Sequence, residues 1–311
     1  MSPRISLAIP VFNGENYLRL AIDSILAQDF HDFELIITDN ASTDGTQAIC
    51  EEAAAGDSRI RYHRNPRNLG AAPNYNRGYE LARGEFLKWC AHDDLLSPNY
   101  LSACLRVLAA NPDAALAFGA TQCIDLQGNP APWDVESEMG SVDHPDPAQR
   151  FYEAITRGGT CFPIFGLFRK DILDRTTLHR TYYGSDRALI AEAALLGKVL
   201  QVPDAIFFNR EHPTRSINMN DLAARSRWQN ASASRRTSME HVNLLTHLLE
   251  IAVRHPDVVP RHRGLRVVGQ YASAPVQLGR YALDLVRYVS PQLGAGLKDV
   301  VKPVFRQISW R

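Results

Sequence analysis

Short apolar runs alternate with segments of helical periodicity through the first 110 residues of the chain. The runs that begin at Ile5, Phe33, Ile60 and Glu85 have the length and apolar character of buried strands. Between them, apolar residues recur at the spacing of an amphipathic helix, as they do over 17–26. This alternation predicts an α/β fold, in which a mostly parallel sheet is flanked by helices on both faces.

The pattern continues to about residue 219 and then changes. Helices are predicted over 44–55, 73–83, 98–110, 151–157 and 186–196, and later strands over 114–120, 199–203 and 205–210. Residues 162–169 are a strand-like run that Pro163 and Gly166 break. Beyond residue 220 the periodicity is helical and includes an amphipathic segment over 274–289. We therefore predict an α/β domain over residues 1–219 and a helical C-terminal region over residues 220–311.

The composition of the 311 residues is that of an ordinary globular protein with a formal net charge of zero. Without net positive charge, general nucleic-acid binding is not expected. Five scattered cysteines, none in a Cys-x-x-Cys pair, indicate reduced thiols rather than disulfides or a zinc site. No apolar stretch reaches the roughly 18–20 residues that cross a bilayer, and the N-terminal run is too short for a signal peptide. We therefore expect a cytoplasmic protein, either free or peripheral on the inner face of the cell membrane.

Polar residues gather at the ends of the predicted strands. Asn13 and Glu15 follow the first strand, Asp39 ends the second, and Asp93 and Asp94 follow the fourth. In open α/β sheets, ligands bind beyond the carboxyl ends of the strands. Because three separate loops bring polar groups to that edge, we expect these loops to line one binding site.

The pair Asp93-Asp94 suits a divalent metal ion. Two carboxylates on a strand-terminal loop are ligands that Mg²⁺ or Mn²⁺ prefers, and such ions usually keep substrate phosphates among their ligands. Adjacent acids at the start of a helix also stabilise the helix dipole. The pair alone does not decide between these two interpretations.

Three loops at this edge of the sheet have the composition of a nucleotide-binding site. Carboxylates and amides over 10–15 and 39–45 can hydrogen-bond a base or a ribose, although the same residue types dominate ordinary turns. The amide-rich segment that begins with Asn68 and Gly70 leads into a helix start, where a phosphate or sugar can bind. The arginines around this segment are alternatively solvated surface charges.

Five segments follow one another in an order and spacing that are specific to one family. They are Pro10-Val-Phe-Asn-Gly-Glu-Asn-Tyr-Leu, Ala21-Ile-Asp-Ser-Ile-Leu-Ala-Gln-Asp-Phe, Phe33-Glu-Leu-Ile-Ile-Thr-Asp-Asn-Ala-Ser-Thr-Asp-Gly-Thr, Asn68-Leu-Gly and His92-Asp-Asp. Over about residues 4–215 the chain resembles the family 2 glycosyltransferases, which have the GT-A fold, and among them those of bacterial cell-surface polysaccharide synthesis. The resemblance implies a nucleotide-diphosphosugar site. Its donor contacts are Pro10, Phe12, Glu15 and Asp39 near the base, together with Asn13, Asn68 and Gly70.

The acidic motif departs from the family pattern. The family usually carries Asp-x-Asp-Asp, whereas the corresponding stretch here is Ala91-His92-Asp93-Asp94, so the first acid is missing. The resemblance implies that Asp93 contacts the donor and binds Mn²⁺ or Mg²⁺, with Asp94 as a second metal ligand. His92 or a water molecule takes the place of the lost donor contact.

Two later segments also match the family. Asn209-Arg210-Glu211-His212 resembles its Arg-x-His segment, which implies that His212 binds the metal ion or the diphosphate and that Arg210 neutralises leaving-group charge. A lone histidine is more often structural than a ligand. Tyr183-Gly184-Ser185-Asp186 resembles the site of the general base, with Ser in place of Glu. Asp186 is therefore the predicted catalytic base, and its alternative role is a helix N-cap.

The acceptor side is less well defined. Gly158-Gly159 and 162–166 fall where the resemblance places the acceptor. Phe162, Phe165 and Trp89 can stack on a sugar, although packing in the core is the alternative for each of them.

The resemblance implies an inverting, metal-dependent transfer of a sugar from a UDP-, GDP- or dTDP-linked donor to a sugar or lipid-linked acceptor. The acceptor hydroxyl needs a base to take its proton during attack, and Asp186 fills that role. Nucleotidyl transfer and non-catalytic nucleotide-sugar binding stay open as alternatives. A nucleotidyltransferase is expected to carry a basic, Gly-rich loop after its first strand, and Phe12-Asn-Gly-Glu-Asn contains no Lys or Arg.

The C-terminal residues 254–311 contain ten Lys or Arg residues against three Asp residues. Amphipathic helices with Arg beside apolar residues can lie on an anionic membrane, which suits a lipid-linked acceptor. They can equally form a helical cap or a homodimer surface with solvated arginines. Both interpretations of the C-terminal helices stay open.

Overall fold

The computed structural model describes residues 2–132, 139–157, 161–213, 215–219, 221–232 and 239–290. The strands are β1 (Ile5–Val11), β2 (Phe33–Asp39), β3 (Ile60–Arg64), β4 (Phe86–Trp89), β5 (Leu95–Leu96), β6 (Ala114–Ile124), β7 (Leu167–Arg169) and β8 (Lys198–Arg210). The helices are α1 (Leu18–Leu26), α2 (Thr46–Gly56), α3 (Ala71–Leu81), α4 (Tyr100–Ala110), α5 (Pro147–Thr156), α6 (Lys170–Leu173), α7 (Ser185–Leu196), α8 (Leu222–Gln229), α9 (Glu240–Arg254), α10 (Arg261–Ala272) and α11 (Pro275–Val289).

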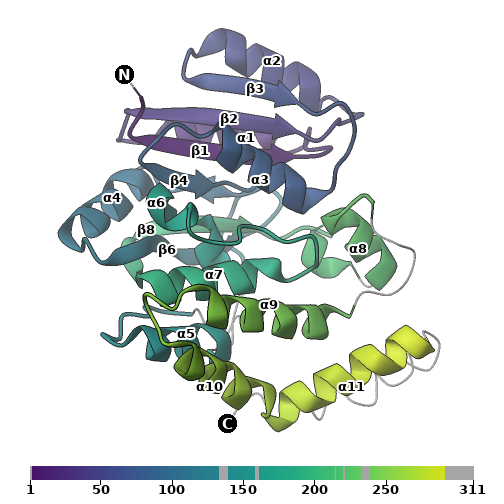
Figure 1. The fold of residues 1–311 in the computed structure, drawn as a ribbon. Coiled ribbons are helices and arrows are strands. Elements are labelled where there is room, and N and C mark those ends of the chain that lie inside the picture. The colour runs from purple at the N-terminus through teal and green to yellow at the C-terminus, as the bar shows by residue number, and fades with distance from the viewer. Residues whose placement is uncertain are drawn as a thin grey trace.

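The strands form one sheet in the order β3-β2-β1-β4-β7-β6-β8-β5 (Figure 1). β1 pairs in parallel with β2 and β4, β2 with β3, and β6 with β8, whereas β7 and β5 run antiparallel to their neighbours. The predicted α/β fold with a mostly parallel sheet is confirmed. Because β1, β2 and β4 are parallel, the loops that follow them leave the same edge of the sheet.

Two predicted strand regions differ in detail from the structure. Phe162–Phe165 forms a 3₁₀ turn, and only Leu167–Arg169 of the strand-like run pairs as β7. Pro163 has no N–H to donate to a sheet, which explains why the strand begins after it. The predicted strands 199–203 and 205–210 form one strand, β8. Its register against β6 shifts between Val202 and Ile206, so Pro203 falls at an irregularity rather than at a strand end.

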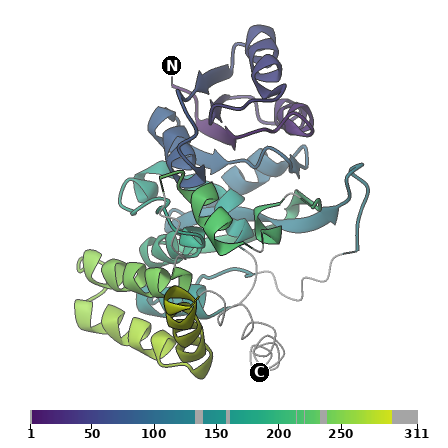
Figure 2. The same cartoon turned by 90° about the vertical axis from the view of Figure 1, so that its right-hand side faces the viewer.

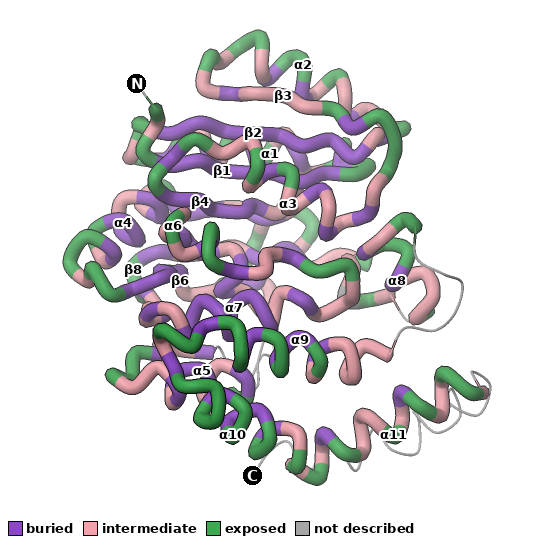
Figure 3. Tube along the Cα trace, viewed as in Figure 1, coloured by how far each residue is buried: buried purple, intermediate pink, exposed green. Residues whose placement is uncertain are grey.

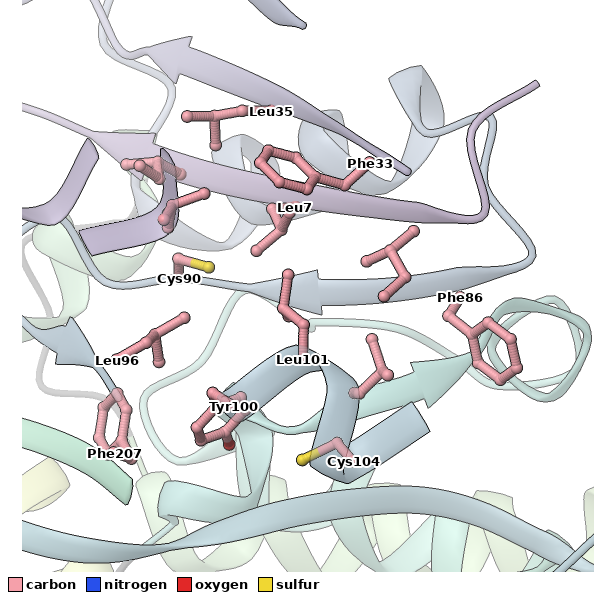
Figure 4. Close-up of a cluster of buried hydrophobic side chains, with 14 of the residues drawn as sticks. Leu7, Phe33, Leu35, Phe86, Cys90, Leu96, Tyr100, Leu101, Cys104 and Phe207 are labelled. Carbon is pink, nitrogen blue, oxygen red and sulfur yellow. The ribbon is translucent and has the colours of Figure 1, made fainter. Parts of the chain in front are cut away.

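Alternate residues of β1 face opposite sides of the sheet. Ile5, Leu7 and Ile9 lie in one apolar cluster with residues of α1 and α4, whereas Ala8 lies in a second cluster with Trp89 and residues of α7. Figure 4 shows part of the first cluster, where side chains of β1, β2 and α4 meet. The strands β1, β2 and β4 are buried along their whole length (Figure 3). Helices thus cover both faces, as a parallel sheet requires.

The described part of the C-terminal region, within residues 221–290, is mainly helical, and its helices α9 and α10 pack on α5 and α7. Leu248 and Ile251 of α9 and Val268 of α10 share an apolar cluster with Phe151 of α5 and Leu195 of α7. Figures 1 and 2 show these helices at the end of the molecule opposite β3, with α11 extending away from them. Within the described ranges, no helix is long and apolar enough to cross a membrane.

Candidate active site

The loops that follow β1 and β2 are bonded to each other. The Asn13 backbone, with φ of 54°, donates its N–H to Ser42 Oγ at 2.9 Å, and Asn13 Oδ1 accepts from the Thr43 N–H at 2.8 Å. The Glu15 carboxylate accepts from the Gly45 N–H at 2.7 Å. Asn13 and Glu15 therefore hold the two loops together at the predicted edge of the sheet. Their predicted contacts with a donor stay predictions.

The rest of the first loop lies between a strand and the acidic motif. Pro10 is buried within β1 opposite Thr38, whereas Phe12 is 41% exposed at the rim. Gly14 allows the loop to approach His92 closely, because a Cβ at Gly14 would lie 2.8 Å from the imidazole Cδ2. The β1 loop and the acidic motif are thus neighbours, as their strand-end positions predict.

Asp39 is fully buried and its carboxylate has several partners. Its Oδ1 accepts from the Ser42 N–H at 2.8 Å. Its Oδ2 accepts from the Tyr62 hydroxyl at 2.8 Å and from Arg64 at 2.6 Å. Burial first, and then the bond to Asp39, raise the pKa of Tyr62. Arg64 is one of the arginines near the Asn68–Gly70 segment, and it places a positive charge beside the predicted site of the donor's nucleobase.

The Asn68–Gly70 loop is fixed by Asn40, which follows Asp39. Asn40 Nδ2 donates to Asn68 Oδ1 at 2.9 Å and to the Gly70 carbonyl at 3.1 Å. Gly70 has φ of 93°, and a Cβ there would lie 2.6 Å from the Asn230 Cα. The close approach that Gly70 permits is therefore to the chain segment after α8. Donor contacts of Asn68 and Gly70 stay predictions.

Asp93 and Asp94 follow β4 and have different partners. Asp93 is 17% exposed, and its Oδ2 lies 2.8 Å from His212 Nε2. Asp94 is buried, and its Oδ1 accepts from Asn209 Nδ2 at 3.1 Å and from the Arg210 N–H at 2.8 Å. Asp94 thus ties the end of β4 to the end of β8, and Asp93 faces His212.

The two carboxyl groups differ in acidity as well. Burial opposes the ionisation of Asp93, but the charge of His92 and the hydrogen bond from His212 lower its pKa to about 2. Burial and the adjacent charge of Asp93 raise the pKa of Asp94. Asp93 is therefore the more strongly ionised member of the pair.

The residues around Asp93 fit part of a metal site. Asp93 and His212 offer a carboxylate oxygen and an imidazole nitrogen side by side, and a divalent cation accepts both when diphosphate oxygens and water complete its shell. Within the described ranges, no three His, Cys, Asp or Glu side chains are grouped for a metal ion. The Asp94 carboxylate is bonded to β8 instead. The binding of Mn²⁺ or Mg²⁺ by Asp93 and His212 therefore stays a prediction, which the distance between their side chains permits.

Arg210 is 1% exposed and is bonded to backbone carbonyls. Its Nε donates to the Asp93 carbonyl at 2.9 Å, and its Nη1 donates to the carbonyls of Asp125 and Leu126 at 2.9 and 3.1 Å. Its guanidinium also lies 4.9 Å from the centre of the Tyr17 ring. This burial favours a structural role that holds the acidic motif in place over the predicted contact with the leaving group.

Asp186 lies in the first turn of α7 beside the acidic motif's edge of the sheet. Its Oδ1 accepts from the Arg187 N–H at 2.9 Å, and the N-cap of α7 is Gly184. The alternative role of Asp186 as an N-cap is therefore wrong. Burial raises its pKa, although the Arg187 N–H and charge and a bond from the Cys161 thiol oppose that shift. A carboxylate with a raised pKa is a stronger base than a solvated one.

Tyr75 of α3 connects the acidic motif with Asp186. Burial raises the pKa of its phenol, and the charges of Asp93, Asp94 and Asp186 raise it further. The charges of all three carboxylates therefore influence one side chain, although they come from distant parts of the sequence. In the sequence, Tyr75 is a tyrosine within a predicted helix, and nothing there marks it as a neighbour of the acidic residues.

The aromatic residues predicted for the acceptor side are largely core residues. Trp89 is fully buried and donates its Nε1–H to the Tyr75 carbonyl at 2.9 Å. Phe165 stacks on Phe207 with ring centres 5.2 Å apart, and Phe162 lies 5.7 Å from the same ring. The structure thus supports the core alternative for Trp89 and Phe165. Gly158-Gly159 lie outside the described residues.

The order of the strands, with helices on both faces of the sheet, defines an α/β protein with the GT-A fold. S. aureus TarS in complex with UDP-GlcNAc matches 97% of this chain and 86% of its own chain, with a TM-score of 0.61 and 16% identity. The mannosyltransferase PcManGT from Pyrobaculum calidifontis, in complex with GDP-Man and Mn²⁺, matches 99% of this chain and 84% of its own, with a TM-score of 0.51 and 18% identity. At these identities the likeness shows the fold alone.

The chain belongs to glycosyl transferase family 2, whose family model matches residues 6–176. It is 31% identical over 196 residues to the GalNAc(5)-diNAcBac-PP-undecaprenol beta-1,3-glucosyltransferase of Campylobacter jejuni, covering 60% of this chain and 58% of that relative. It is 27% identical over 213 residues to the putative glycosyltransferase EpsH of Bacillus subtilis, covering 68% of this chain and 56% of EpsH. A third relative is an uncharacterized glycosyltransferase of Rickettsia bellii, and its match to this chain covers only 18% of that relative's length.

Proposed function

We propose that the protein is an inverting glycosyltransferase that moves a sugar from a nucleotide-diphosphosugar to an acceptor hydroxyl and uses Mn²⁺ or Mg²⁺. Membership of the family supports sugar transfer as the reaction. The observation that carries the proposal is the pairing of Asp93 with His212, whose Nε2 lies 2.8 Å from the Asp93 carboxylate beyond the carboxyl end of β4. Asp186, in the first turn of α7, is the second carboxylate of the proposal. A single displacement needs one group for the metal ion and another for the acceptor proton.

The loops after β1 and β2 are the proposed site of the donor nucleotide. Phe12 offers an exposed apolar ring at the rim, and Asp39 and Arg64 form a charged pair at the end of β2. TarS and PcManGT, which share the fold, are complexed with UDP-GlcNAc and GDP-Man. A UDP-, GDP- or dTDP-linked sugar is therefore the proposed class of donor.

In the proposed reaction, Asp186 accepts the proton of the acceptor hydroxyl while the hydroxyl oxygen attacks the anomeric carbon. The bond from that carbon to the diphosphate oxygen breaks, and the nucleoside diphosphate leaves. Because attack and departure occur on opposite sides of the carbon, its configuration inverts. Asp93 and His212 are the proposed holders of the divalent ion, which when bound stabilises charge on the diphosphate.

A sugar or lipid-linked acceptor in cell-surface polysaccharide or glycoconjugate synthesis is the finer part of the proposal. The Campylobacter jejuni relative is named for a PP-undecaprenol compound. In this proposal residues 1–219 form the catalytic domain on the cytoplasmic side. Residues 220–311 form a cap, a dimer surface or a peripheral contact with the membrane, and α11 supports such a contact through exposed Leu278, Leu285 and Val289.

The test begins with a panel of UDP-, GDP- and dTDP-sugars in a thermal-shift assay with Mn²⁺, because a bound ligand stabilises the folded state. Release of the nucleoside diphosphate from the best donor is then measured with and without EDTA. We expect release that depends on the metal ion. Release of pyrophosphate would indicate nucleotidyl transfer, and donor binding without turnover would indicate a non-catalytic binding protein.

A further inference from the structure

The turn that presents Asp186 depends on contacts from outside itself. The described residues 174–184, between α6 and α7, contain neither helix nor strand. At their end Gly184 adopts φ of 91° and forms the N-cap of α7, just before Asp186. An irregular segment keeps one conformation only when its surroundings hold it. The segment's buried contacts with α9 are therefore relevant to the position of Asp186.

His247 of α9 lies at the centre of these contacts and is 4% exposed. Its Nε2 lies 2.7 Å from Thr177 Oγ1, and its Nδ1 lies 2.9 Å from the Tyr182 hydroxyl. The Thr177 hydroxyl donates to the Glu192 carboxylate of α7 at 2.7 Å, and the Thr177 N–H donates to the same oxygen at 2.8 Å. One imidazole thus joins two points of the irregular segment and, through Thr177, reaches α7.

The donors and acceptors fix the tautomer of His247. The one hydroxyl proton of Thr177 is given to Glu192, so Thr177 Oγ1 must accept from His247 Nε2–H. His247 Nδ1 then accepts from the Tyr182 hydroxyl. This assignment needs a neutral ring, and burial, which lowers the pKa of His247, favours that form.

Tyr182 links His247 to the turn that precedes the proposed base, Asp186. Its ring packs against the apolar cluster formed by α5, α7, α9 and α10. Its carbonyl accepts from the Ser185 N–H at 3.3 Å, in the turn that leads directly to Asp186. Gln229 at the end of α8 contacts the same turn, because its Nε2 lies 3.4 Å from Ser185 Oγ and also donates to the Arg180 carbonyl at 3.2 Å.

We propose that His247 is a positioning residue, which fixes the turn that presents Asp186 by joining Thr177 to Tyr182. The proposal rests on the proposed role of Asp186 as the base. A displacement of about 1 Å in a reacting group can lower a rate by about 10²-fold. The proposal also places part of the control of the base in α9, outside residues 6–176 that the family model matches.

The experiment compares four variants of the full chain. His247→Ala removes both hydrogen bonds, His247→Gln keeps one hydrogen-bonding group, and Tyr182→Phe removes one hydroxyl and keeps the ring. Thr246→Ala, at the exposed neighbouring position of α9, is the matched control. We expect kcat to fall about 10- to 100-fold in His247→Ala and less in the other two, with the KM for the donor unchanged.

Hydrogen exchange gives a second measurement that does not need activity. We expect faster exchange of the amides of residues 183–187 in His247→Ala and Tyr182→Phe, with exchange in β1 and β2 unchanged. If the wild type transfers no sugar, the role of Asp186 fails, and unchanged exchange at 183–187 would separately overturn the positioning role. Wild-type kcat in both His247→Ala and Tyr182→Phe would also overturn the positioning role. So would a fall in kcat in Thr246→Ala as large as that in His247→Ala. If His247→Ala does not fold, Tyr182→Phe decides.

Discussion

Adjacent carboxyl groups beyond β4 are expected to respond differently to substitution. Asp94→Ala leaves Asn209 Nδ2 and the Arg210 N–H without a buried acceptor, so we expect it to lower the free energy of unfolding by about 1–3 kcal/mol. Asp93→Asn keeps the shape of a partly exposed side chain. Because the folded state lowers the pKa of Asp93 to about 2, loss of this charge also lowers the free energy of unfolding at pH 7. We expect the variant to remove most of the metal-dependent turnover. Urea unfolding and donor turnover with Mn²⁺ measure the two effects. Full metal-dependent turnover by Asp93→Asn, or wild-type stability of Asp94→Ala, would contradict these assignments.

Asp186 is expected to lower stability at neutral pH. Its folded-state pKa is raised above the ordinary value of 3.8, chiefly by burial. The folded state therefore binds the proton more tightly than the unfolded state, and stability is lost as the pH rises through the folded pKa. Asp186→Asn removes the charge, so we expect a higher Tm at pH 7, by roughly 2–4 °C for each kcal/mol gained. The gain should shrink near pH 4, and a lower Tm at pH 7 would contradict the prediction.

The same substitution separates stability from activity. Asparagine cannot take a proton from a hydroxyl, so Asp186→Asn is expected to lose transfer while it keeps donor binding in a thermal-shift assay. In the wild type, kcat/KM should fall as the pH drops through the raised pKa of Asp186. Transfer by Asp186→Asn at the wild-type rate would remove Asp186 from the role of the base.

The site residues differ in how far the sequence can indicate them. Asp93 and His212 lie in segments whose order and spacing match a family, and the structure brings their side chains to 2.8 Å. Tyr75 has no such signal. The importance of Arg64, one of several arginines near the Asn68–Gly70 segment, comes from its contact with Asp39, which is remote in the sequence. Arg210 is the opposite case. Its position in the motif implies a contact with the leaving group, whereas its burial favours a structural role.

At the scale of elements, periodicity predicts where most strands and helices lie but not how they end. The apolar run that begins at Ile5 is β1, and the run at Phe33 is β2. Periodicity fails where a proline changes the hydrogen bonding. The predicted break at Pro163 is a 3₁₀ turn, whereas Pro203 lies at an irregularity within one strand where two were predicted. These outcomes depend on neighbouring strands that a sequence window does not contain.

The contact between the Asn68–Gly70 loop and α8 predicts a strong effect of one methyl group. Gly70 has φ of 93° and ψ of 167°, a region that is essentially restricted to glycine, and a Cβ would meet the backbone of Asn230. We expect Gly70→Ala to lower the free energy of unfolding by about 1–3 kcal/mol or more. Gly269→Ala in α10 is the control, because a Cβ there meets nothing within 4 Å. Urea unfolding measures both, and a Gly70→Ala variant as stable as the wild type would contradict the contact.

At the scale of the whole molecule, the C-terminal helices share a core with the α/β part of the chain. Phe151 and Leu195, both buried, are packed against Leu248, Ile251 and Val268 of α9 and α10. The amphipathic pattern beyond residue 220 predicts that these helices have an apolar face. It does not say which surface covers that face, because a helix packed within its own chain and a helix on a membrane have the same periodicity.

Truncation separates these roles of the C-terminal helices. A chain that ends at residue 219 exposes the side chains that α9 and α10 cover, and each large apolar side chain contributes about 1.5–3 kcal/mol by burial. The sum of several such losses is comparable to the free energy of unfolding of a typical protein, which is about 5–15 kcal/mol. We therefore expect the chain 1–219 to aggregate or to unfold without a cooperative transition.

A chain that ends at residue 273 keeps α9 and α10 and removes α11 and everything after it. It loses Asp284, whose carboxylate accepts from the His241 and Val242 N–H groups at the start of α9, so we expect a folded chain with a lower Tm. Circular dichroism during heating and size-exclusion chromatography compare both chains with the full one. Co-sedimentation of the 273-residue chain with anionic vesicles, against the full chain, then tests the part beyond α10 for membrane contact. A chain 1–219 that unfolds cooperatively at the wild-type Tm would show that α9 and α10 are an appendage, and would remove the physical reason for linking α9 to the position of Asp186.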